Sequence, residues 1–198
     1  MNSESLSARL ILASSSKYRQ MLLHRFGIPF ICVSPETDET RQDNESPFEL
    51  VGRLASEKAR SVSRENPRAI VIGSDQIAIF ENQVVGKPGN HEAALEQLLS
   101  FSGMNVEFLT AVSVQCIASG FNEQAIDSTR VSFRDLQYDE IRRYLAIEKP
   151  YDCAGSFKAE SLGITLFESI KSEDPTALTG LPLICTSAML RRAGLQVP

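Results

Sequence analysis

The chain has 198 residues, 42% of them hydrophobic and 23% charged, and its formal net charge is −5 at pH 7. A chain of this length can bury one full core, so we expect residues 1–198 to form a single domain. The acidic balance without any basic block excludes a general nucleic-acid surface, and the lack of an apolar run of about 18 residues excludes a membrane-spanning helix.

The four cysteines, Cys32, Cys116, Cys153 and Cys185, are far apart and follow no zinc-binding or CxxC spacing. Each stands among apolar neighbours, and the chain shows no signal-peptide pattern. We therefore expect reduced, buried cysteines in a cytoplasmic protein. Only two histidines are present, which argues against a histidine-rich metal site.

Residues 1–8 are polar and are expected to precede the first element. After them, short apolar runs alternate with amphipathic segments, which predicts strands and helices in turn. The expected elements are a strand at 10–13, a helix at 17–26, a strand at 30–33, a helix at 46–64 and a strand that starts at 69. Ser46, Pro47 and Glu49 match the start of the second helix, because serine caps a helix, proline suits its first position and the glutamate completes a capping box.

A carboxylate follows the most apolar of these strands. Residues 69–72 lead into Gly73-Ser74-Asp75-Gln76, which we interpret as turn residues at the end of a buried strand. Because an unpaired charge is costly to bury, Asp75 there suggests a general base or a metal ligand at the mouth of an α/β cleft. The alternative is a turn aspartate satisfied by nearby backbone N–H groups.

The second half of the chain continues the alternation, with one hairpin inserted near the middle. The expected elements are a turn at 81–82, a helix at 91–101, strands at 106–116 and 126–133, a helix at 139–146, a polar loop at 151–160, a strand at 164–170 and a helix at 183–192. This order is typical of an α/β (mixed α+β) domain with a mixed sheet.

Three hydroxyl side chains stand between the first strand and the first helix. Ser14 and Ser16 would add donors to the free N–H groups of the helix N-terminus, which accepts phosphate well. Arg19 could fork onto phosphate oxygens. The segment is not a Walker loop, since it lacks GxxxxGK, and serines before a helix are most often caps.

Two lysines and a second acid complete the candidate site. Lys58 falls on the apolar stripe of its helix, and Lys87 follows Gly86; both are candidate phosphate ligands. The alternative for Lys58 is a side chain that snorkels from the apolar face to solvent, and the alternative for Lys87 is a solvated loop lysine. Glu39 and Asp75 could together hold Mg²⁺, which prefers oxygen ligands; otherwise Glu39 is an exposed loop acid. Without a nucleophilic Ser, Cys or His constellation, the set suits metal-assisted water attack on a polyphosphate.

The same residues resemble a family signature. The segment Leu10-Ile-Leu-Ala-Ser-Ser-Ser-Lys-Tyr-Arg19 resembles the opening motif of the Maf nucleotide pyrophosphatases, and the pattern continues in order through 38–39, 54–59, 72–75, 86–88 and 180–182. The resemblance implies a Maf/inosine-triphosphatase-like twisted mixed sheet with flanking helices and a nucleotide cleft between two lobes. It implies hydrolysis of a nucleoside triphosphate to monophosphate and pyrophosphate with Mg²⁺ or Mn²⁺. By resemblance, Asp75 is the proton acceptor, and Arg19, Glu39, Lys58 and Lys87 are the other polar cleft positions.

The loop at 153–160 resembles the branch of the family that acts on 7-methyl-GTP, whose role is expected to be the exclusion of modified nucleotides. By resemblance, Tyr18, Gln76 and Glu160 are its specificity positions. N7-methylation makes guanine cationic, so an aromatic face such as that of Tyr18 attracts it. The Glu160 carboxylate can accept from the guanine N1–H and N2–H₂ edge. A pyrimidine offers neither feature, which would leave the carboxylate unpaired.

The chain departs from the family pattern at three positions. Lys17 stands where the family often has proline, Tyr18 where this branch has tryptophan, and Gln20 where a second arginine is usual. Losing that arginine either weakens triphosphate binding or shifts the contact to Lys17. Two other functions stay open: a dTTP/UTP pyrophosphatase, and a nucleotide-sensing regulator of septum formation. The oligomeric state is open too, a homodimer included.

Overall fold

The computed structural model describes residues 10–197, so the expectation for residues 1–8 lies outside the described part of the chain. The strands are β1 (Leu10–Ala13), β2 (Phe30–Val33), β3 (Ile70–Phe80), β4 (Gln83–Val85), β5 (Asn105–Cys116), β6 (Phe121–Phe133) and β7 (Phe167–Lys171). The α-helices are α1 (Lys17–His24), α2 (Pro47–Glu65), α3 (His91–Phe101), α4 (Tyr138–Glu148) and α5 (Leu183–Arg192).

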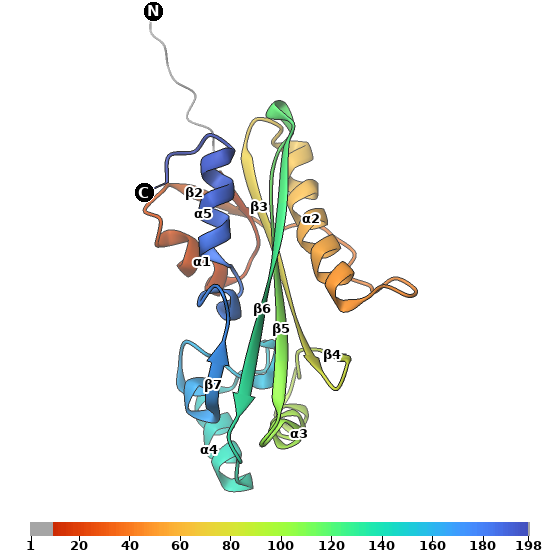
Figure 1. The fold of residues 1–198 in the computed structure, drawn as a ribbon, viewed down its shortest axis with the longest axis vertical. Helices are drawn as coiled ribbons and strands as arrows, with labels where there is room; N and C mark the ends of the chain where they lie inside the picture. Colours follow the sequence, from red (N-terminus) through yellow and green to blue (C-terminus); the bar gives the residue numbers. More distant parts are fainter. Residues whose placement is uncertain (1–9, 198) are drawn as a thin grey trace, which may run out of the picture.

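Within residues 10–197, seven strands form one mixed sheet in the order β2-β1-β3-β5-β6-β7, with β4 paired to β3. β1 is parallel to β2 and β3, and every other pairing is antiparallel. The long strands β3, β5 and β6 run along most of the length of an elongated molecule (Figure 1). The predicted mixed α/β class is confirmed.

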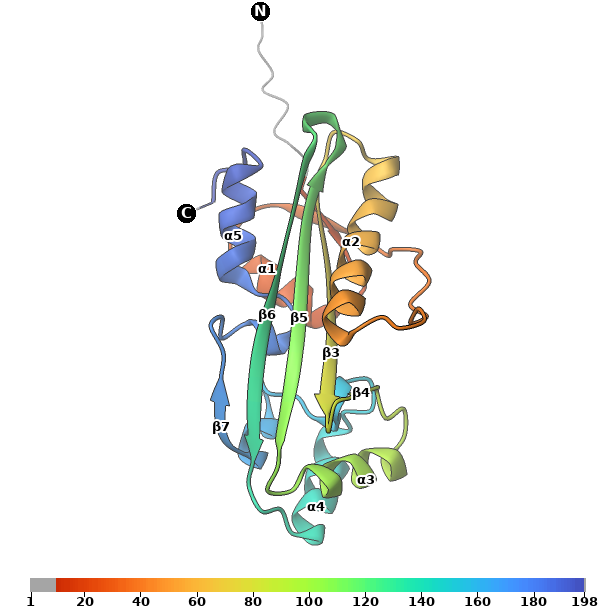
Figure 2. The same cartoon turned by 45° about the vertical axis from the view of Figure 1, so that its right-hand side comes forward.

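Helices cover the two faces of the sheet at one end and gather below it at the other (Figure 2). Because side chains alternate along a strand, Leu10 and Leu12 pack with α1 and α5, whereas Ile11 and Ala13 pack with α2. We call this end, with β1, β2, α1, α2 and α5, the first lobe, and the end with α3, α4, β4 and β7 the second lobe. The sheet therefore separates two apolar clusters on its opposite faces in the first lobe and links them to another cluster in the second lobe.

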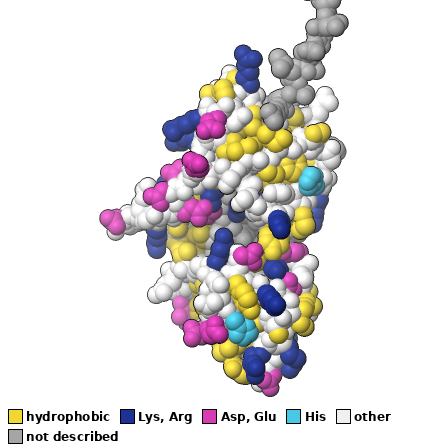
Figure 3. Space-filling view, turned by 180° about the vertical axis from the view of Figure 1, so that it is seen from behind, with side chains coloured by type: hydrophobic (Ala, Val, Ile, Leu, Met, Phe, Trp, Pro, Cys, Tyr) yellow, Lys and Arg dark blue, Asp and Glu magenta, His cyan; other side chains and the backbone are white. Residues whose placement is uncertain are grey.

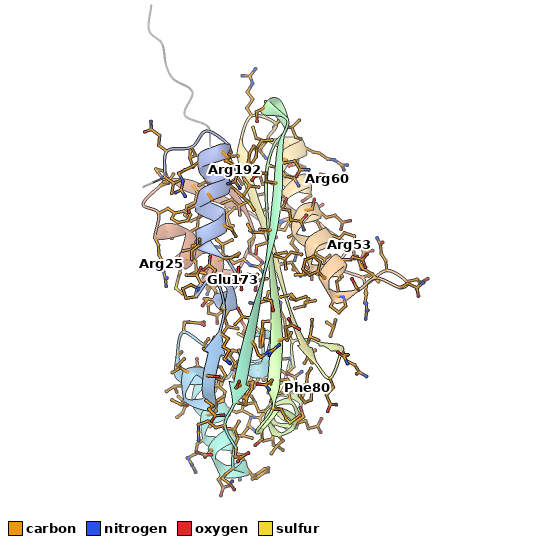
Figure 4. The ribbon with its side chains drawn as sticks, viewed as in Figure 1. Arg25, Arg53, Arg60, Phe80, Glu173 and Arg192 are labelled. Atoms are coloured by element: carbon orange, nitrogen blue, oxygen red, sulfur yellow. The ribbon has the colours of Figure 1, made fainter. Side chains whose placement is uncertain are left out.

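The second lobe has an aromatic core. Phe133 lies 5.2 to 5.8 Å, between ring centroids, from Phe101, Phe157 and Phe167. Phe80, labelled near the second-lobe end of β3 in Figure 4, extends this cluster with a ring contact of 5.0 Å to Phe101. The cluster joins the sheet to α3 and to the segment that follows α4, which gives the polar loop at 151–160 a fixed base.

Local signals placed several elements correctly. The capping box of α2 is present: Glu49 N donates to Ser46 Oγ (3.3 Å) and Ser46 N donates to Glu49 Oε2 (2.9 Å). The turn at 81–82 uses positive φ at Glu81 (49°) and Asn82 (62°). The helix expected at 183–192 is α5 with those same bounds.

The prediction of turn residues at 73–76 is wrong, because β3 continues through Asp75 to Phe80. Gly73 is needed for a different reason. A Cβ there would lie 2.3 Å from the Ala55 carbonyl oxygen and 2.5 Å from the Ala59 nitrogen, both in α2. The glycine thus permits a close approach of strand and helix rather than a change of direction.

Several other boundaries differ from the sequence prediction, and most of them shift by one or two residues. The first helix ends at His24, two residues early, and β6 starts at Phe121 because its polar first residues pair with β5 through their backbone. The strand expected at 164–170 is wrong in its first part, which is the 3₁₀ helix Leu162–Leu166. There the Gly163 nitrogen donates to the Lys158 carbonyl oxygen (3.1 Å), which curls the chain before β7 begins.

The cysteines are free thiols, but the expectation that all are buried is wrong. Cys116 is buried, Cys153 and Cys185 are half-buried, and Cys32 is exposed on β2. None of the helices within residues 10–197 combines the length and the hydrophobicity that a membrane crossing requires.

Candidate active site

A cavity of about 760 Å³ lies between the two lobes, with walls from both. Nine of the ten predicted site residues line it: Ser14, Ser16, Tyr18, Arg19, Glu39, Lys58, Gln76, Lys87 and Glu160. The tenth, Asp75, is 8% exposed and lies behind the Lys58 ammonium group. Basic and acidic side chains gather at mid-height on the face shown in Figure 3, between the lobes.

The turn from β1 into α1 forms one wall. The Ser14 hydroxyl oxygen accepts from Ser16 N (3.1 Å), and the Ser16 hydroxyl oxygen accepts from Arg19 N (3.4 Å) as the N-cap of α1. Ser16 is therefore a helix cap, Ser14 holds the turn before it, and both also line the cavity. Their hydroxyl hydrogens are available to a ligand at the positive end of the helix dipole.

Arg19 is fixed by one edge of its guanidinium group. Its Nε donates to the Gly180 carbonyl oxygen (2.9 Å), and its two terminal nitrogens have no hydrogen-bond partner within residues 10–197. Burial lowers the pKa of Arg19, and the nearby carboxylates of Asp75 and Glu39 oppose that shift. The free edge of the group is thus a preoriented cation at the cavity wall.

Lys58 joins the two candidate acids. Its Nζ lies 2.6 Å from Asp75 Oδ1 and 2.6 Å from Glu39 Oε1, and the residue is 7% exposed. The hydrogen bond from Lys58 lowers the pKa of Glu39, with further help from Lys87 and Arg19 and against the effect of burial. Lys58 is therefore a buried, paired cation rather than a snorkelling one.

The second carboxylate oxygen of Asp75 is open. Oδ2 accepts no hydrogen bond from residues 10–197. In the same range, Ser63 Oγ is the single side-chain nitrogen or oxygen that is both sealed from solvent and unpartnered. Asp75 Oδ2 is consequently within reach of water, while Oδ1 is held by Lys58. This arrangement suits a group that accepts a proton from a water molecule.

The donor set fits a divalent cation shared with a ligand. No group of three or more His, Cys, Asp or Glu side chains with metal-binding geometry occurs within residues 10–197. Mg²⁺ needs only one or two carboxylates when substrate phosphates complete its shell, and Asp75 and Glu39 can supply these. Both acids share the Lys58 ammonium group, so a cation between them would require Lys58 to turn toward a phosphate.

The predicted specificity positions meet at another part of the wall. The Gln76 amide nitrogen lies within hydrogen-bond distance of Thr110 Oγ1 (2.9 Å) and of the carbonyl oxygens of Ala177 and Leu178 (both 3.0 Å). Its amide oxygen accepts no hydrogen bond from residues 10–197 and is not sealed from solvent, so it is open in the same way as Asp75 Oδ2. Gln76 therefore presents an acceptor.

The ring of Tyr18 stands next to the 151–160 loop. Burial raises the pKa of its phenol, and the neighbouring Cys153, Asp152 and Glu160 raise it further, so the hydroxyl stays neutral. Cys153 Sγ lies 3.9 Å from the Tyr18 oxygen. Glu160 is exposed at the rim of the same cavity. An aromatic ring and an acid thus face one space.

Several functional neighbours had no recognisable sequence signal. Ser74 Oγ lies 2.9 Å from the Gly180 carbonyl oxygen, the same atom that holds Arg19. The motif at 180–182 marks this segment, but a backbone carbonyl leaves no side-chain pattern. Phe108 and Phe157 add apolar walls. Of the departures from the family pattern, Lys17 lines the cavity, whereas Gln20 is not among its lining residues.

Comparison with known proteins defines the class. The model of the family described as Maf-like protein matches residues 9–193, and the chain belongs to the Maf family. Three relatives that are named 7-methyl-GTP pyrophosphatase come from Xanthomonas campestris pv. campestris (strain 8004), Polaromonas sp. and Albidiferax ferrireducens. They are 53%, 51% and 48% identical to this chain; the matches cover 96%, 96% and 98% of it and 98%, 87% and 98% of the relatives, respectively. The Staphylococcus aureus Ham1 protein, a solved structure, aligns with a TM-score of 0.47 and 17% identity over 78% of this chain and 89% of that one.

Proposed function

We propose that this chain is a nucleoside triphosphate pyrophosphatase that hydrolyses 7-methyl-GTP to 7-methyl-GMP and pyrophosphate. The observation that carries the proposal is a single cavity whose lining includes an aromatic ring, Tyr18, a rim carboxylate, Glu160, and four cationic side chains: Lys17, Arg19, Lys58 and Lys87. The names of relatives about half identical over nearly the full length support the same substrate.

The base would be selected by charge and by hydrogen bonds. The neutral Tyr18 ring offers a π face to the cationic methylated guanine. Glu160 accepts from the N1–H and N2–H₂ edge, and the open amide oxygen of Gln76 provides one more acceptor. Thymine or uracil carries no positive charge and offers one N3–H donor in place of the adjacent N1–H and N2–H₂ pair, so at least one of these acceptors would be left unpaired, at a cost that gives strong discrimination.

The triphosphate would lie against the opposite set of charges. Ser14 and Ser16 offer hydroxyls at the N-terminus of α1, and the free edge of Arg19 can form two parallel bonds to phosphate oxygens. Lys17, which also lines the cavity, can replace the arginine that the family pattern has at Gln20. These fixed cations offset the charge that develops on the phosphates during the reaction.

Asp75 would activate the attacking water. Its open Oδ2 accepts a proton as the water oxygen bonds to the α-phosphorus, the bond to the bridging oxygen breaks, and pyrophosphate leaves with the electron pair. Lys58 orients the carboxylate through Oδ1. A divalent cation bound by Asp75 and Glu39 would supply additional charge neutralisation on the phosphates. The free thiols fit the reducing cytoplasm where such nucleotides occur.

The test is pyrophosphate release from 7-methyl-GTP, GTP, dTTP and UTP, each with Mg²⁺ or Mn²⁺. We expect preference for 7-methyl-GTP and dependence on the metal. Asp75→Asn should lower turnover at least about 1000-fold with the fold intact, because the proton acceptor is lost. Asp43→Asn, at an exposed loop acid, is the matched control and should keep wild-type turnover. An active Asp75→Asn variant would show that Asp75 is not the base.

A second pair of variants tests the base reader. Glu160→Gln keeps the shape of the side chain but removes its charge, so we expect kcat/KM for 7-methyl-GTP to fall on the order of 10-fold to 100-fold with little change for UTP. Glu96→Gln makes the same change at an exposed acid of α3 outside the cavity and should change neither substrate. Preference for dTTP or UTP in the wild type would instead favour the sister activity, and binding without metal-dependent release would favour a sensor.

A further inference from the structure

One polar side chain outside the cavity contacts two of the segments that carry charged residues of the cavity wall. Gln97, on α3, donates from Nε2 to the Gly86 carbonyl oxygen (3.1 Å), and its Oε1 accepts from Ser156 Oγ (2.5 Å). Gly86 directly precedes Lys87, and Ser156 belongs to the loop that ends at Glu160. Lys87 and Glu160 line the cavity, whereas Gln97 is not among its lining residues.

The loop end of this link has a demanding backbone conformation. Gly155 and Ser156 have φ values of 78° and 61°, and Ser156 is fully buried. A Cβ at Gly155 would lie 2.8 Å from Cζ of Phe108, so glycine is required there. Serine is unfavourable in the left-handed region, and such residues persist where their surroundings hold them. The hydrogen bond to Gln97 is such a restraint.

Two further contacts join the same segments. Gly89 N donates to the Tyr151 carbonyl oxygen (2.9 Å), and His91 Nδ1 lies 3.1 Å from the Tyr151 hydroxyl. The segment 86–91 and the segment 151–156 are thus attached to each other along their length. Gln97 adds a bond to each of them, at the end nearest Lys87 in one segment and at the end nearest Glu160 in the other.

We propose that Gln97 is a positioning residue for substrate selection: it sets the distance between Lys87 and Glu160, and so determines which nucleotides can engage both. A ligand gains the full binding free energy of two contacts only when the two protein groups lie at the separation that the ligand spans, because moving either group or distorting the ligand costs binding free energy. The inference rests on the proposed function for the identity of the base, but not for the connection between the two segments.

The test variant is Gln97→Met, which keeps the length of the side chain and a good helix former while removing both hydrogen bonds. Glu96→Met, at an exposed position of the same helix, is the matched control. Ser156→Gly is a second variant: it removes the hydroxyl but tolerates positive φ, so it separates the lost bond from backbone strain. We would measure kcat and KM for 7-methyl-GTP and UTP, and dissociation constants for both nucleotides in EDTA.

We expect Gln97→Met to raise KM for 7-methyl-GTP about fivefold with kcat within about twofold, and to lower the preference over UTP by about fivefold, the effect of roughly one hydrogen bond. Ser156→Gly should lower the preference in the same direction, and Glu96→Met should not change it. In a Glu160→Gln background the effect of Gln97→Met on the preference should vanish, because the group that it positions is gone.

A merely structural role gives a different pattern. If Gln97→Met lowers kcat for both nucleotides by one factor, or leaves the preference unchanged, or keeps its effect in the Glu160→Gln background, the positioning role is wrong. Failure of the proposed function is seen separately, in the wild type. If the wild type prefers another nucleotide, the preference for that nucleotide over UTP is compared in place of the preference for 7-methyl-GTP. If the wild type shows no turnover, the ratio of the dissociation constants of 7-methyl-GTP and UTP in EDTA is compared between the variants in the same way.

Discussion

Replacing Gly73 by alanine tests whether the packing of β3 on α2 also builds the active site. The added Cβ would lie 2.3 Å from the Ala55 carbonyl oxygen, whereas ordinary contact begins at 3.4 Å, so strand and helix would have to separate by about 1 Å. Both atoms met first, the Ala55 oxygen and the Ala59 nitrogen, are backbone atoms of the helix, so no rotamer change can relieve the clash.

Overpacking of this kind costs on the order of 3 kcal/mol in unfolding free energy. For a chain of this size that corresponds to a fall of about 6–12 °C in the midpoint of thermal unfolding. The same displacement moves Lys58, which α2 carries next to Ala59, away from Asp75 on β3. Misplacement by about 1 Å can cost on the order of 100-fold in rate, so we expect turnover to fall by about that factor.

The assay combines urea unfolding with pyrophosphate release at saturating nucleotide. Gly86→Ala is the matched control: its Cβ would meet nothing within 4 Å, so stability should stay within about 0.5 kcal/mol of the wild type. If Gly73→Ala matched the wild type in both stability and turnover, the close approach of β3 and α2 described above would be incorrect. If stability fell while turnover per folded molecule did not, Lys58 would not need its present position.

Three further perturbations follow from buried charges. Lys58→Met leaves the Asp75 carboxylate without its cation. The unfolding free energy should therefore fall by about 3 kcal/mol, and turnover should fall on the order of 100-fold. A variant that is as stable in urea and as active in pyrophosphate release as the wild type would contradict this. The hydrogen bond from Arg53, which projects from α2 in Figure 4, lowers the pKa of Glu45 from 4.5 to about 2. A depressed carboxyl pKa stabilises the fold fully above about pH 4.5, and this contribution is lost as pH falls toward 2. Between these pH values the urea midpoint of Glu45→Gln should therefore depend less on pH than that of the wild type. Plots of urea midpoint against pH that run parallel for the two proteins would refute the assignment. The Asp174 carboxylate accepts from Thr176 Oγ1 and from Ile184 N, both at 2.6 Å. Asp174→Asn should therefore lower the unfolding free energy by about 2 kcal/mol in thermal melts. An unchanged midpoint of thermal unfolding would argue against this.

Elements with strong local signals could be predicted from the sequence. The serine, proline and glutamate at the start of α2 act within one turn of helix, so their effect does not depend on the rest of the fold. Period-two alternation likewise predicted the position of β5 but with one buried face, whereas the structure buries both faces from Phe108 to Cys116. Lys58 stood out because it interrupts an apolar stripe, and the structure gives the reason in its two carboxylate partners.

Features that depend on distant contacts could not be predicted in this way. Gly73 resembles a turn residue in sequence, but what requires it is the backbone of α2, which no local pattern reports. The strand expected from residue 164 fails because Gly163 folds back onto Lys158. For the site, the residue types and the family motifs selected side chains that do line one cavity, whereas the carbonyl oxygen of Gly180 and the link through Gln97 exist only in three dimensions.

Three strands pass without interruption from one lobe to the other, and this limits how far the two lobes can move relative to each other. β3 and β5 stay paired from Val71 and Gln115 to Ile79 and Glu107, across the floor of the cavity. Widening the gap between the lobes would mean bending this ladder, not swinging about a flexible connector. Under the proposed function, nucleotide and product would then pass over the rim, where the 151–160 loop lines the cavity together with Ser34, Pro35 and Glu39. Under the proposed function, the part of the cavity built on these strands therefore has its shape before the nucleotide binds.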